Sequence, residues 1–258
     1  MPIIDDKKKI VKIVGLNDLL KYSKKRSFKK LKIPLMIMAG GKGTRLKPFT
    51  QILPKPLIPL KGKAMILRII DYFLKYGVSK IFISINDKSE IIKAFFKEQS
   101  DYYKVLFFKE TKPLGTAGSL SFLNGKINSN FFLTNCDTLI DDNYNKIYKN
   151  HLIKKNDVTI VISKFKLKVP YGIILHNKDN FKGISEKPSY SFYFNVGLYV
   201  ISKNILKLIK RNKKMNIDDL IEIAQKRKYK IGIYKISNKK VHDTGNWSQY
   251  FKTQKLIN

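Results

Sequence analysis

Cysteine, acidic residues and long apolar runs are scarce in this sequence of 258 residues. The single cysteine, Cys136, excludes an internal disulfide bond and a zinc site built from several cysteines. His151, His176 and His242 lack the spacing of metal ligands. No apolar stretch approaches the roughly 20 residues of a membrane-spanning helix, and the opening MPIIDDKKKI lacks the apolar segment of a signal peptide. We therefore expect a cytoplasmic protein that does not insert into a membrane.

The shortage of acidic residues gives the chain a strongly basic balance. Lysine and arginine total 52 against 19 aspartates and glutamates, a formal net charge of +33. Such a charge attracts nucleic acids and anionic membranes. The lysines are nevertheless scattered through every segment, without an arginine-rich arm or a repeated basic and aromatic unit. We expect a dispersed basic surface and no nucleic-acid partner, with a polyanion-binding protein as the alternative.

The first 33 residues differ in pattern from the rest. PIIDDKKKIVKIVG has the pattern of a strand, an Asp-Asp-Lys turn and a second strand, and LNDLLKYSKK places leucines at helical spacing. This segment resembles the end of a CBS module, but the other half of such a module does not accompany it, so no nucleotide-sensing role is carried over. We predict a partial CBS-like segment and linker over residues 1–33 and one main domain over residues 34–258.

From residue 34 onward, short β-branched or aromatic runs alternate with amphipathic stretches. PLMIMA, KIFISI and NFFLTN are predicted strands, and AMILRIIDYFLKYG and SEIIKAFFKE are predicted helices. This alternation predicts an α/β fold with a Rossmann-like open sheet, mixed but mainly parallel, and helices on both faces. After Asp157 the pattern changes to strands joined by turns, which predicts an antiparallel addition. Open sheets of this kind bind ligands at the carboxyl ends of their strands.

A glycine-rich loop follows the first predicted strand of the main domain, in MIMAGGKGTRLKPFTQILPKPL. It is not a P-loop, because its lysine precedes the last glycine, and not a dinucleotide fingerprint, because Leu46 occupies the third glycine position. The loop instead has the pattern G-G-x-G-T-R, and the backbone N–H groups of such a glycine-rich loop can face phosphate oxygens. Arg45 adds positive charge, as does Lys55 on a segment stiffened by two prolines. The loop therefore indicates a phosphate-binding site.

The loop and six later segments resemble, in the same order, the signature motifs of sugar nucleotidyltransferases. The six segments are ETKPLGTAGSL, TNCD, PYGII, SEKP, FNVGLYV and HDTGNW, although many relatives carry a D-x-G-[TS] run in place of the last. These enzymes join a nucleoside triphosphate to a sugar 1-phosphate and release pyrophosphate. The resemblance runs from about Leu35 to Gln249. It implies that residues 34–258 are the catalytic domain, with an antiparallel sugar-binding addition and a Mg²⁺ cofactor.

The resemblance also implies roles for individual residues. Arg45 would neutralise charge on the β and γ phosphates, and Lys55 would lie near the α-phosphate and the attacking phosphate. The expected catalytic residues are Arg45, Lys55, Asp137 and Lys187. The expected nucleotide-binding residues are Ala39, Gly40, Gly41, Gly43, Thr44, Arg45, Glu110, Pro113, Gly115 and Thr116. The expected ligands of the sugar phosphate are Lys55, Gly172, Glu186, Lys187 and Asn195.

Two aspartates are expected to hold the metal ion. Asp137 follows a predicted buried strand, and Asp243 lies close to a glycine after the last predicted strand. Mg²⁺ prefers a few carboxylates together with phosphate oxygens and water, and the resemblance implies that both aspartates are ligands. The nearby Asp141 and Asp142 are instead expected to cap a helix over residues 141–151.

Glu110 bears on the choice of base. It occupies the position that holds glutamine in many uridylyl and thymidylyl relatives. A carboxylate only accepts hydrogen bonds, which matches the N1–H and 2-amino donors of guanine, whereas uracil and thymine offer a donor and an acceptor. We therefore expect GTP, with UTP, dTTP or CTP as alternatives. Mannose, heptose and glucosamine 1-phosphates all stay open as the sugar, for precursors of surface glycans.

One rival on the same fold is a catalytically silent regulatory subunit. The intact Arg45, Lys55, Asp137 and Asp243 argue against that rival. The sequence leaves a homo-oligomer open.

Overall fold

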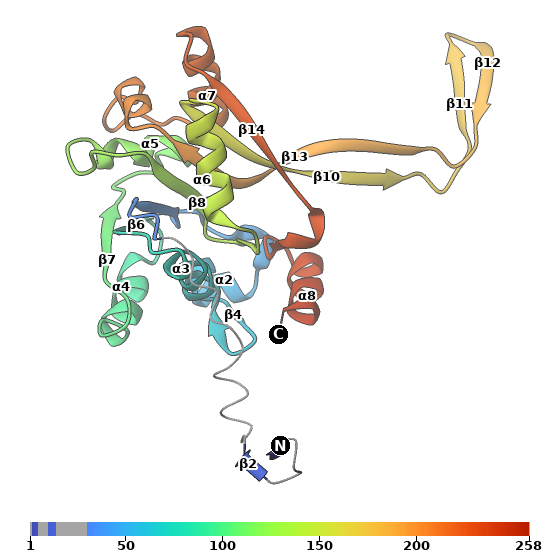
Figure 1. Cartoon of the computed structure of the whole chain (residues 1–258). Helices are drawn as coiled ribbons and strands as arrows, with labels where there is room; N and C mark the ends of the chain where they lie inside the picture. Colours follow the sequence, from blue (N-terminus) through green and yellow to red (C-terminus); the bar gives the residue numbers. More distant parts are fainter. Residues whose placement is uncertain (1, 5–9, 14–29, 258) are drawn as a thin grey trace.

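The computed structural model describes residues 2–4, 10–13 and 30–257 (Figure 1). β1 (Pro2–Ile4) and β2 (Ile10–Ile13) pair antiparallel, so both strands predicted near the start of the chain are present. The helix predicted from LNDLLKYSKK lies outside the described residues, and the division of the chain at residue 33 stays a prediction. In the described ranges, no helix combines the length and apolar character needed to cross a membrane.

The centre of the main domain is a seven-stranded sheet. In order across the sheet, its strands are β14 (Ile231–Ile236), β10 (Val158–Lys168), β13 (Ser189–Ile201), β8 (Phe131–Asn135), β3 (Leu35–Met38), β6 (Ile81–Ile85) and β7 (Val105–Lys109). Four of its six pairings are parallel, and the two antiparallel ones both involve β13. The predicted mixed, mainly parallel sheet is confirmed.

Within the central sheet, the addition predicted after Asp157 is antiparallel where β13 pairs with β10 and β8, but not at β14. β14 pairs parallel with β10, because the antiparallel β13 has already returned the chain to the end of the sheet at which β10 begins. Two short antiparallel pairs complete the domain: β9 (Thr138–Ile140) with β15 (Val241–Asp243), and β4 (Pro59–Leu60) with β5 (Lys63–Ala64).

Helices cover both faces of the sheet, as predicted. In β3, Leu35 and Ile37 belong to one buried cluster and Met36 to the other, because alternate residues of a strand point to opposite faces. Against the first cluster pack α3 (Met65–Lys75), α4 (Ser89–Glu98), α6 (Tyr144–Ile153) and α8 (Trp247–Leu256). Against the second pack α5 (Gly115–Gly118), α7 (Ile217–Lys226) and the 3-10 turns η3 (Ser119–Leu123) and η4 (Lys203–Leu208).

Helix α3 shows how the sequence produces this layer. Ile66, Ile69, Ile70 and Phe73 recur at helical spacing and are buried, whereas Leu74 is 41% exposed. Residues 115–123 form the short α5 followed by η3, and residues 203–208 form η4; such 3-10 segments suit short connecting pieces.

The cap of α6 also differs from the prediction. Asn143, not Asp141 or Asp142, is the N-cap, and its side chain accepts a hydrogen bond from Lys146 N. The chain at Asp142 is instead drawn toward the C-terminal segment, because Asp142 Oδ1 lies 2.9 Å from Lys240 Nζ. The prediction failed because an ion pair between distant segments competes with local capping.

Strands β10 and β13 extend far beyond the body of the molecule (Figure 1). Their antiparallel pairing continues in one register from Ile162, opposite Asn195, to the end of β10. A second hairpin of β11 (Ile173–Asn177) and β12 (Asn180–Ser185) stands at the far end. We call residues 164–194 the arm.

Candidate active site

Two adjoining cavities lie at the carboxyl ends of β3 and β8 and share Arg45, Asn135 and Asp137. The larger has a volume of about 420 Å³, a size typical of small-molecule sites. Its lining residues are Met38, Gly40, Gly41, Gly43, Thr44, Arg45, Lys55, Ser84, Glu110, Pro113, Gly115, Thr116, Asn135, Cys136 and Asp137. The smaller cavity adds Thr138, Phe194, Asn195, Val196, Gly197, Val241 and Asp243. We call the two cavities together the cleft.

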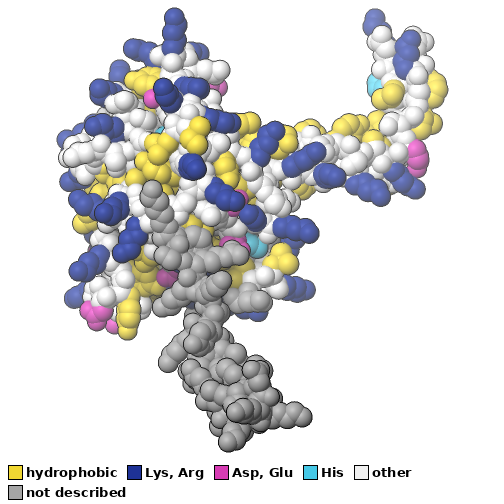
Figure 2. Space-filling model, viewed as in Figure 1, with side chains coloured by type: hydrophobic (Ala, Val, Ile, Leu, Met, Phe, Trp, Pro, Cys, Tyr) yellow, Lys and Arg dark blue, Asp and Glu magenta, His cyan; other side chains and the backbone are white. Residues whose placement is uncertain are grey.

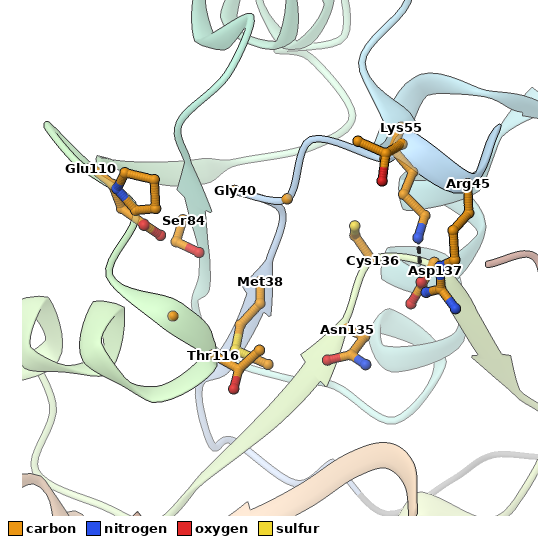
Figure 3. A pocket seen from close by; sticks show the side chains of 15 residues that line it. Met38, Gly40, Arg45, Lys55, Ser84, Glu110, Thr116, Asn135, Cys136 and Asp137 are labelled. Atoms are coloured by element: carbon orange, nitrogen blue, oxygen red, sulfur yellow. Dashed lines mark hydrogen bonds and ion pairs between the residues drawn. The ribbon is translucent and has the colours of Figure 1, made fainter. Parts of the chain in front are cut away.

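The cleft has two chemically different ends. Glu110 lies at one end, and Arg45, Lys55 and Asp137 gather at the other, with Gly40 of the glycine loop between them (Figure 3). All the residues predicted to bind the nucleotide line the larger cavity except Ala39, which is buried just before the loop. The structure therefore brings this predicted set together.

The glycine loop packs against the segment that carries Lys55. Gly43 has a φ of 65°, in the left-handed region that favours glycine. A Cβ at this position would lie 2.9 Å from both Lys55 Cβ and Thr50 Cγ2. Thr50 Oγ1 also donates a hydrogen bond to the Gly43 carbonyl over 2.9 Å. The close contact at Gly43 thus sets the spacing between Lys55 and Arg45, which follows in the 3-10 turn η1 (Thr44–Leu46).

Gly41 differs, because the packing of the chain does not require a glycine there. A Cβ at this position would meet no atom of the described chain within 4 Å, and its φ lies outside the left-handed region. Gly41 nevertheless lines the larger cavity. A glycine at such a position leaves room for a ligand to approach the backbone N–H groups closely.

Glu110 is almost fully buried, with 7% of its surface exposed. Its Oε2 accepts a hydrogen bond from Leu114 N over 3.0 Å, and a Cβ on Gly40 would lie 3.0 Å from its Oε1. Burial raises the pKa of this carboxyl, while hydrogen bonds from Leu114 N and from the side chains of Ser84 and Asn86 lower it. Glu110 is thus a fixed acceptor next to the glycine loop.

Lys55 and Asp137 form an ion pair largely removed from solvent. Lys55 Nζ lies 2.5 Å from Asp137 Oδ2, and the two side chains are 11% and 14% exposed. Thr244 holds the backbone of Asp137 from the other side, because its N–H and its Oγ1 both donate to the Asp137 carbonyl over 2.9 Å. Because a charge in such a place is costly to leave alone, each partner fixes the position of the other.

Asp243 approaches the same point from the end of β15. It lies opposite Thr138 in the pairing of β15 with β9, and its Oδ1 accepts a hydrogen bond from Gly245 N over 2.6 Å. A Cβ on Gly245 would lie 3.0 Å from Asp243 Oδ1, 3.4 Å from Asp137 Oδ2 and 3.4 Å from Arg45 Nη2. Two carboxylates and a guanidinium therefore converge on one glycine.

Asn195 lines the smaller cavity, next to this cluster. Its Oδ1 accepts a hydrogen bond from Gly197 N over 2.9 Å, and its Nδ2 donates to the Tyr199 hydroxyl. Gly197, with a φ of 77°, faces Asn135, since a Cβ there would lie 2.5 Å from Asn135 Nδ2. The structure thus places Asn195 and Asn135 side by side at the cleft.

Gly172, Glu186 and Lys187 lie on the arm and do not line the cleft. A Cβ on Gly172 would lie 2.9 Å from Glu186 Oε2, and Lys187 Nζ lies 3.6 Å from Glu186 Oε1. The structure brings these three together, but the stretch of β13 from Ser189 to Asn195 separates them from the cleft by about 20 Å at about 3.3 Å per residue. Their predicted role in binding the sugar phosphate stays a prediction.

Four residues that line the larger cavity were not predicted from the sequence: Met38, Ser84, Asn135 and Cys136. Asn135 could have been found, because it ends a predicted strand two residues before Asp137. Ser84 is a buried hydroxyl within the otherwise apolar strand IFISI, a signal in itself. Burial raises the pKa of the Cys136 thiol to about 12, so that thiol stays protonated and is a poor nucleophile.

Residues 35–258 match the model of a family described as nucleotidyl transferase. The chain belongs to the nucleotidyl transferase family. Among curated proteins, this chain is 33% identical over 184 residues to a mannose-1-phosphate guanyltransferase of Hypocrea jecorina. That match covers 67% of this chain and 50% of the relative. The chain thus spans about half the length of the curated relatives it matches.

Solved structures also resemble this chain. A crystal structure of HddC from Yersinia pseudotuberculosis complexed with GMP-PN has a TM-score of 0.65 and 27% identity, covering 86% of this chain and 98% of that one. A structure of a putative glucose-1-phosphate thymidylyltransferase from Bacillus anthracis has a TM-score of 0.68 at 20% identity, covering 88% and 96% of the two chains. The second likeness shows the shared fold.

Proposed function

We propose that this nucleotidyl transferase is a sugar-1-phosphate guanylyltransferase, which converts GTP and a sugar 1-phosphate to a GDP-sugar and pyrophosphate. The observation that carries the proposal is the arrangement of the cleft, with a fixed carboxylate acceptor at Glu110 and the cations Arg45 and Lys55 at the other end (Figure 3). Guanine presents N1–H and 2-amino donors to a carboxylate, and the cations suit the phosphates. The names of the mannose-1-phosphate guanyltransferases and the GMP-PN complex of HddC support the same base.

The proposed reaction is an in-line displacement at the α-phosphorus of GTP. An oxygen of the sugar 1-phosphate forms the new bond, and the bond from the α-phosphorus to the bridging oxygen of pyrophosphate breaks. The attacking phosphate is already ionised near neutral pH, so no general base is required. Arg45 would stabilise charge on the β and γ phosphates, and Lys55 would align the α-phosphate with the nucleophile. Catalysis would then consist of positioning and electrostatic stabilisation.

Asp137 and Asp243 would hold the Mg²⁺ ion of this reaction. Burial and the nearby charge of Asp137 raise the pKa of Asp243, whereas Gly245 N–H, Lys55 and Arg45 lower it. Two close carboxylates repel each other, so their convergence fits a divalent cation that takes its remaining ligands from phosphate oxygens and water. Mg²⁺ bound here would neutralise charge on the triphosphate and on the leaving pyrophosphate.

The sugar site would begin at Asn195 and include Lys55, with Gly172, Glu186 and Lys187 of the arm as further ligands. The sugar itself stays open among mannose, heptose and glucosamine 1-phosphates. We place the enzyme in the cytoplasm, a reducing compartment that suits the unpaired thiol of Cys136. It would supply GDP-sugars for surface glycans.

A pyrophosphate-release assay tests the proposal. The purified protein is incubated with Mg²⁺, each of GTP, UTP, CTP, ATP and dTTP, and a panel of sugar 1-phosphates. We expect release with GTP and one sugar 1-phosphate, and none after removal of the metal ion by a chelator. Turnover with UTP or CTP but not with GTP would overturn the choice of base. Silence across the panel from a folded protein that binds Mg²⁺-GTP would favour the regulatory subunit.

A further inference from the structure

Arg45 is a cation of the cleft that its own side-chain contacts do not hold in place. Lysine and arginine side chains are spread over the visible surface (Figure 2), but Arg45 and Lys55 are the only cations among the described residues that line the cleft. Lys55 is held by its ion pair with Asp137. The guanidinium of Arg45 makes no side-chain hydrogen bond within the described part of the chain, although its charge lies near Asp243. Its position therefore depends on the backbone that carries it.

The backbone that carries Arg45 is the single 3-10 turn η1, which has few hydrogen bonds of its own. Leu46 N donates to the Gly43 carbonyl over 2.9 Å, and Lys47 N donates to the Thr44 carbonyl over 3.4 Å, a long hydrogen bond. The close contact at Gly43 fixes the start of the turn. The carbonyl of Lys47, at the other end, is one of the groups that a helical turn leaves without an internal partner. The turn therefore needs a second point of attachment at its end.

Trp247 supplies this second attachment. Its Nε1 donates a hydrogen bond to the carbonyl of Lys47 over 2.9 Å, two residues after Arg45. Its ring also packs edge-on against Phe49, the first residue of α2 (Phe49–Ile52), with 4.9 Å between the ring centroids. Trp247 is the only tryptophan of the chain, and it ends the segment HDTGNW. One side chain thus holds the backbone that leaves η1 by a directed hydrogen bond and an aromatic contact.

Trp247 is itself fixed in place by helix α8, which it begins. The N-cap residue of this helix, Asn246, accepts a hydrogen bond from Gln249 N over 3.0 Å. Further along the helix, Thr253 Oγ1 donates to the carbonyl of Asp243 over 2.7 Å. The helix therefore connects Trp247 to the segment that carries Asp243. The hydrogen bond from the indole ring then joins that segment to the glycine loop across the cleft.

This connection accounts for the place of the guanidinium. A Cβ on Gly245 would lie 3.4 Å from Arg45 Nη2 and 3.0 Å from Asp243 Oδ1, so the guanidinium and the carboxylate meet at the same glycine. A shift of η1 would carry the guanidinium away from this point, because a side chain moves with its backbone. Small displacements of this kind are costly where a charged group must meet a reacting phosphate.

We propose that Trp247 is the positioning residue of Arg45. Its hydrogen bond to Lys47 holds η1 so that the guanidinium meets the β and γ phosphates of the bound nucleoside triphosphate. Trp247 does not line the cleft, so it acts through Arg45 and not on the substrate. The identity of the ligand rests on the proposed function. Glu110 lies at the other end of the cleft, so Trp247 has no part in reading the base (Figure 3).

A comparison of GTP with GMP tests the proposal without any assay of turnover. GMP lacks the β and γ phosphates, so Arg45 contributes to the binding of GTP alone. W247F keeps an aromatic ring but loses the indole N–H. We expect this variant to raise the dissociation constant of Mg²⁺-GTP by about 3–10-fold in isothermal titration calorimetry, and that of GMP by less than about 2-fold. R45Q, which removes the charge itself, should raise the constant for Mg²⁺-GTP by about 10–100-fold.

The double variant R45Q/W247F shows whether Trp247 acts through Arg45. Without the guanidinium there is no charge left to misplace, so the double variant should bind Mg²⁺-GTP as R45Q does, within about 2-fold. The matched control is Y250F on the same helix, which removes a hydrogen bond of 2.6 Å from the Tyr250 hydroxyl to the Pro59 carbonyl. Y250F should keep both dissociation constants. The hydrogen bond of Trp247 is exposed and that of Tyr250 is partly buried, so W247F should be no less stable than Y250F in urea denaturation.

Kinetics provide a second contrast between the two substrates. W247F should lower kcat/KM for GTP and leave KM for the sugar 1-phosphate unchanged, because Arg45 serves the triphosphate. Equal weakening of GTP and GMP, additive losses in R45Q/W247F, or a W247F variant that binds Mg²⁺-GTP like wild type would overturn the role of Trp247. A wild-type chain that binds Mg²⁺-GTP but releases no pyrophosphate would contradict the proposed function, and the comparison of GTP with GMP would still decide the role of Trp247. If another triphosphate binds in place of GTP, the same comparison is made with that triphosphate and its monophosphate.

Discussion

The cleft and the arm hold their predicted site residues by opposite means. In the cleft, Lys55 and Asp137 are paired at 2.5 Å and nearly excluded from solvent, and Thr244 fixes the backbone of Asp137. On the arm, Glu186 and Lys187 are 3.6 Å apart, largely exposed, and carried by a two-stranded ribbon. Substitutions in the cleft should therefore damage chemistry or folding, and substitutions on the arm should leave the fold intact.

The largest expected effect is that of D137N on turnover. Asparagine keeps the shape of the side chain but removes the charge that Lys55 and the proposed metal ion require. We expect kcat for pyrophosphate release to fall by roughly 10³-fold, the scale of losing a main electrostatic contributor. Circular dichroism should still show a folded protein. D101N, at an exposed aspartate away from the cleft, is the matched control and should keep the wild-type rate. Near-normal turnover of D137N would remove Asp137 from the metal site.

A comparison of two glycines measures how tightly the cleft is packed. Gly43 and Gly62 both have a left-handed φ, but a Cβ at 43 would meet Lys55 and Thr50 at 2.9 Å, whereas a Cβ at 62 meets nothing within 4 Å. G43A should lower the free energy of unfolding by about 2–4 kcal/mol, through backbone strain and overpacking together. G62A should lower it by about 1 kcal/mol, from strain alone. Equal losses in urea denaturation would show that the contact at Gly43 contributes nothing.

The next effect concerns the choice of base. E110Q replaces the two carboxylate oxygens of Glu110, which both accept hydrogen bonds, with one amide oxygen that accepts and one amide nitrogen that donates. The amide oxygen of the glutamine can still accept the hydrogen bond from Leu114 N. We expect kcat/KM for GTP to fall by roughly 10–100-fold, which corresponds to a charged hydrogen bond of about 1.5–3 kcal/mol. In the same variant, kcat/KM for UTP should either fall less than kcat/KM for GTP or rise. E98Q, at an exposed glutamate of α4, is the control. An unchanged ratio of GTP to UTP would contradict base reading by Glu110.

The same residue predicts a dependence on pH. Burial raises the pKa of Glu110, so its carboxylate is lost earlier than usual as the pH falls, and KM for GTP should rise on that side. The raised pKa also means that Glu110 favours folding most below its ordinary pKa, and that this contribution is lost as the pH rises through the folded value. E110Q should accordingly be no less stable than wild type at pH 7. A KM for GTP that rises equally in E110Q would assign the pH effect to another group.

Much of the fold outside the arm could be predicted, because the sequence patterns that indicate it lie within short stretches of the chain. The alternation of strands with helices such as α3 identifies the sheet, and the glycine loop points to phosphate wherever it lies in space. Asp137 could be predicted as a site residue because strand ends meet at one edge. The parallel strand β14 and the cap of α6 could not, since both depend on contacts between distant segments such as Lys240 with Asp142.

The arm was the least predictable part. The alternation in residues 164–168 predicts strand equally well inside a sheet or beyond its edge, because the period of two is the same in both. Exposure of Phe165 and Phe192 follows only from the fact that no helix covers this stretch in the described structure. Sequence pattern therefore grouped Glu186 and Lys187 with the cleft by resemblance, whereas the folded chain holds them about 20 Å of strand away.

The smallest expected effect provides the counterpart to the cleft variants. E186Q breaks an ion pair whose partners are 67% and 61% exposed, so water replaces the lost interaction. The free energy of unfolding should change by less than about 0.5 kcal/mol, whereas G43A should lower it by about 2–4 kcal/mol. In the same variant, KM for the sugar 1-phosphate should rise while kcat changes little, because an arm residue would contribute to binding before the phosphates react. A loss of stability above about 1 kcal/mol in urea denaturation would mean that the arm is coupled to the core, and the contrast between the two regions would fail.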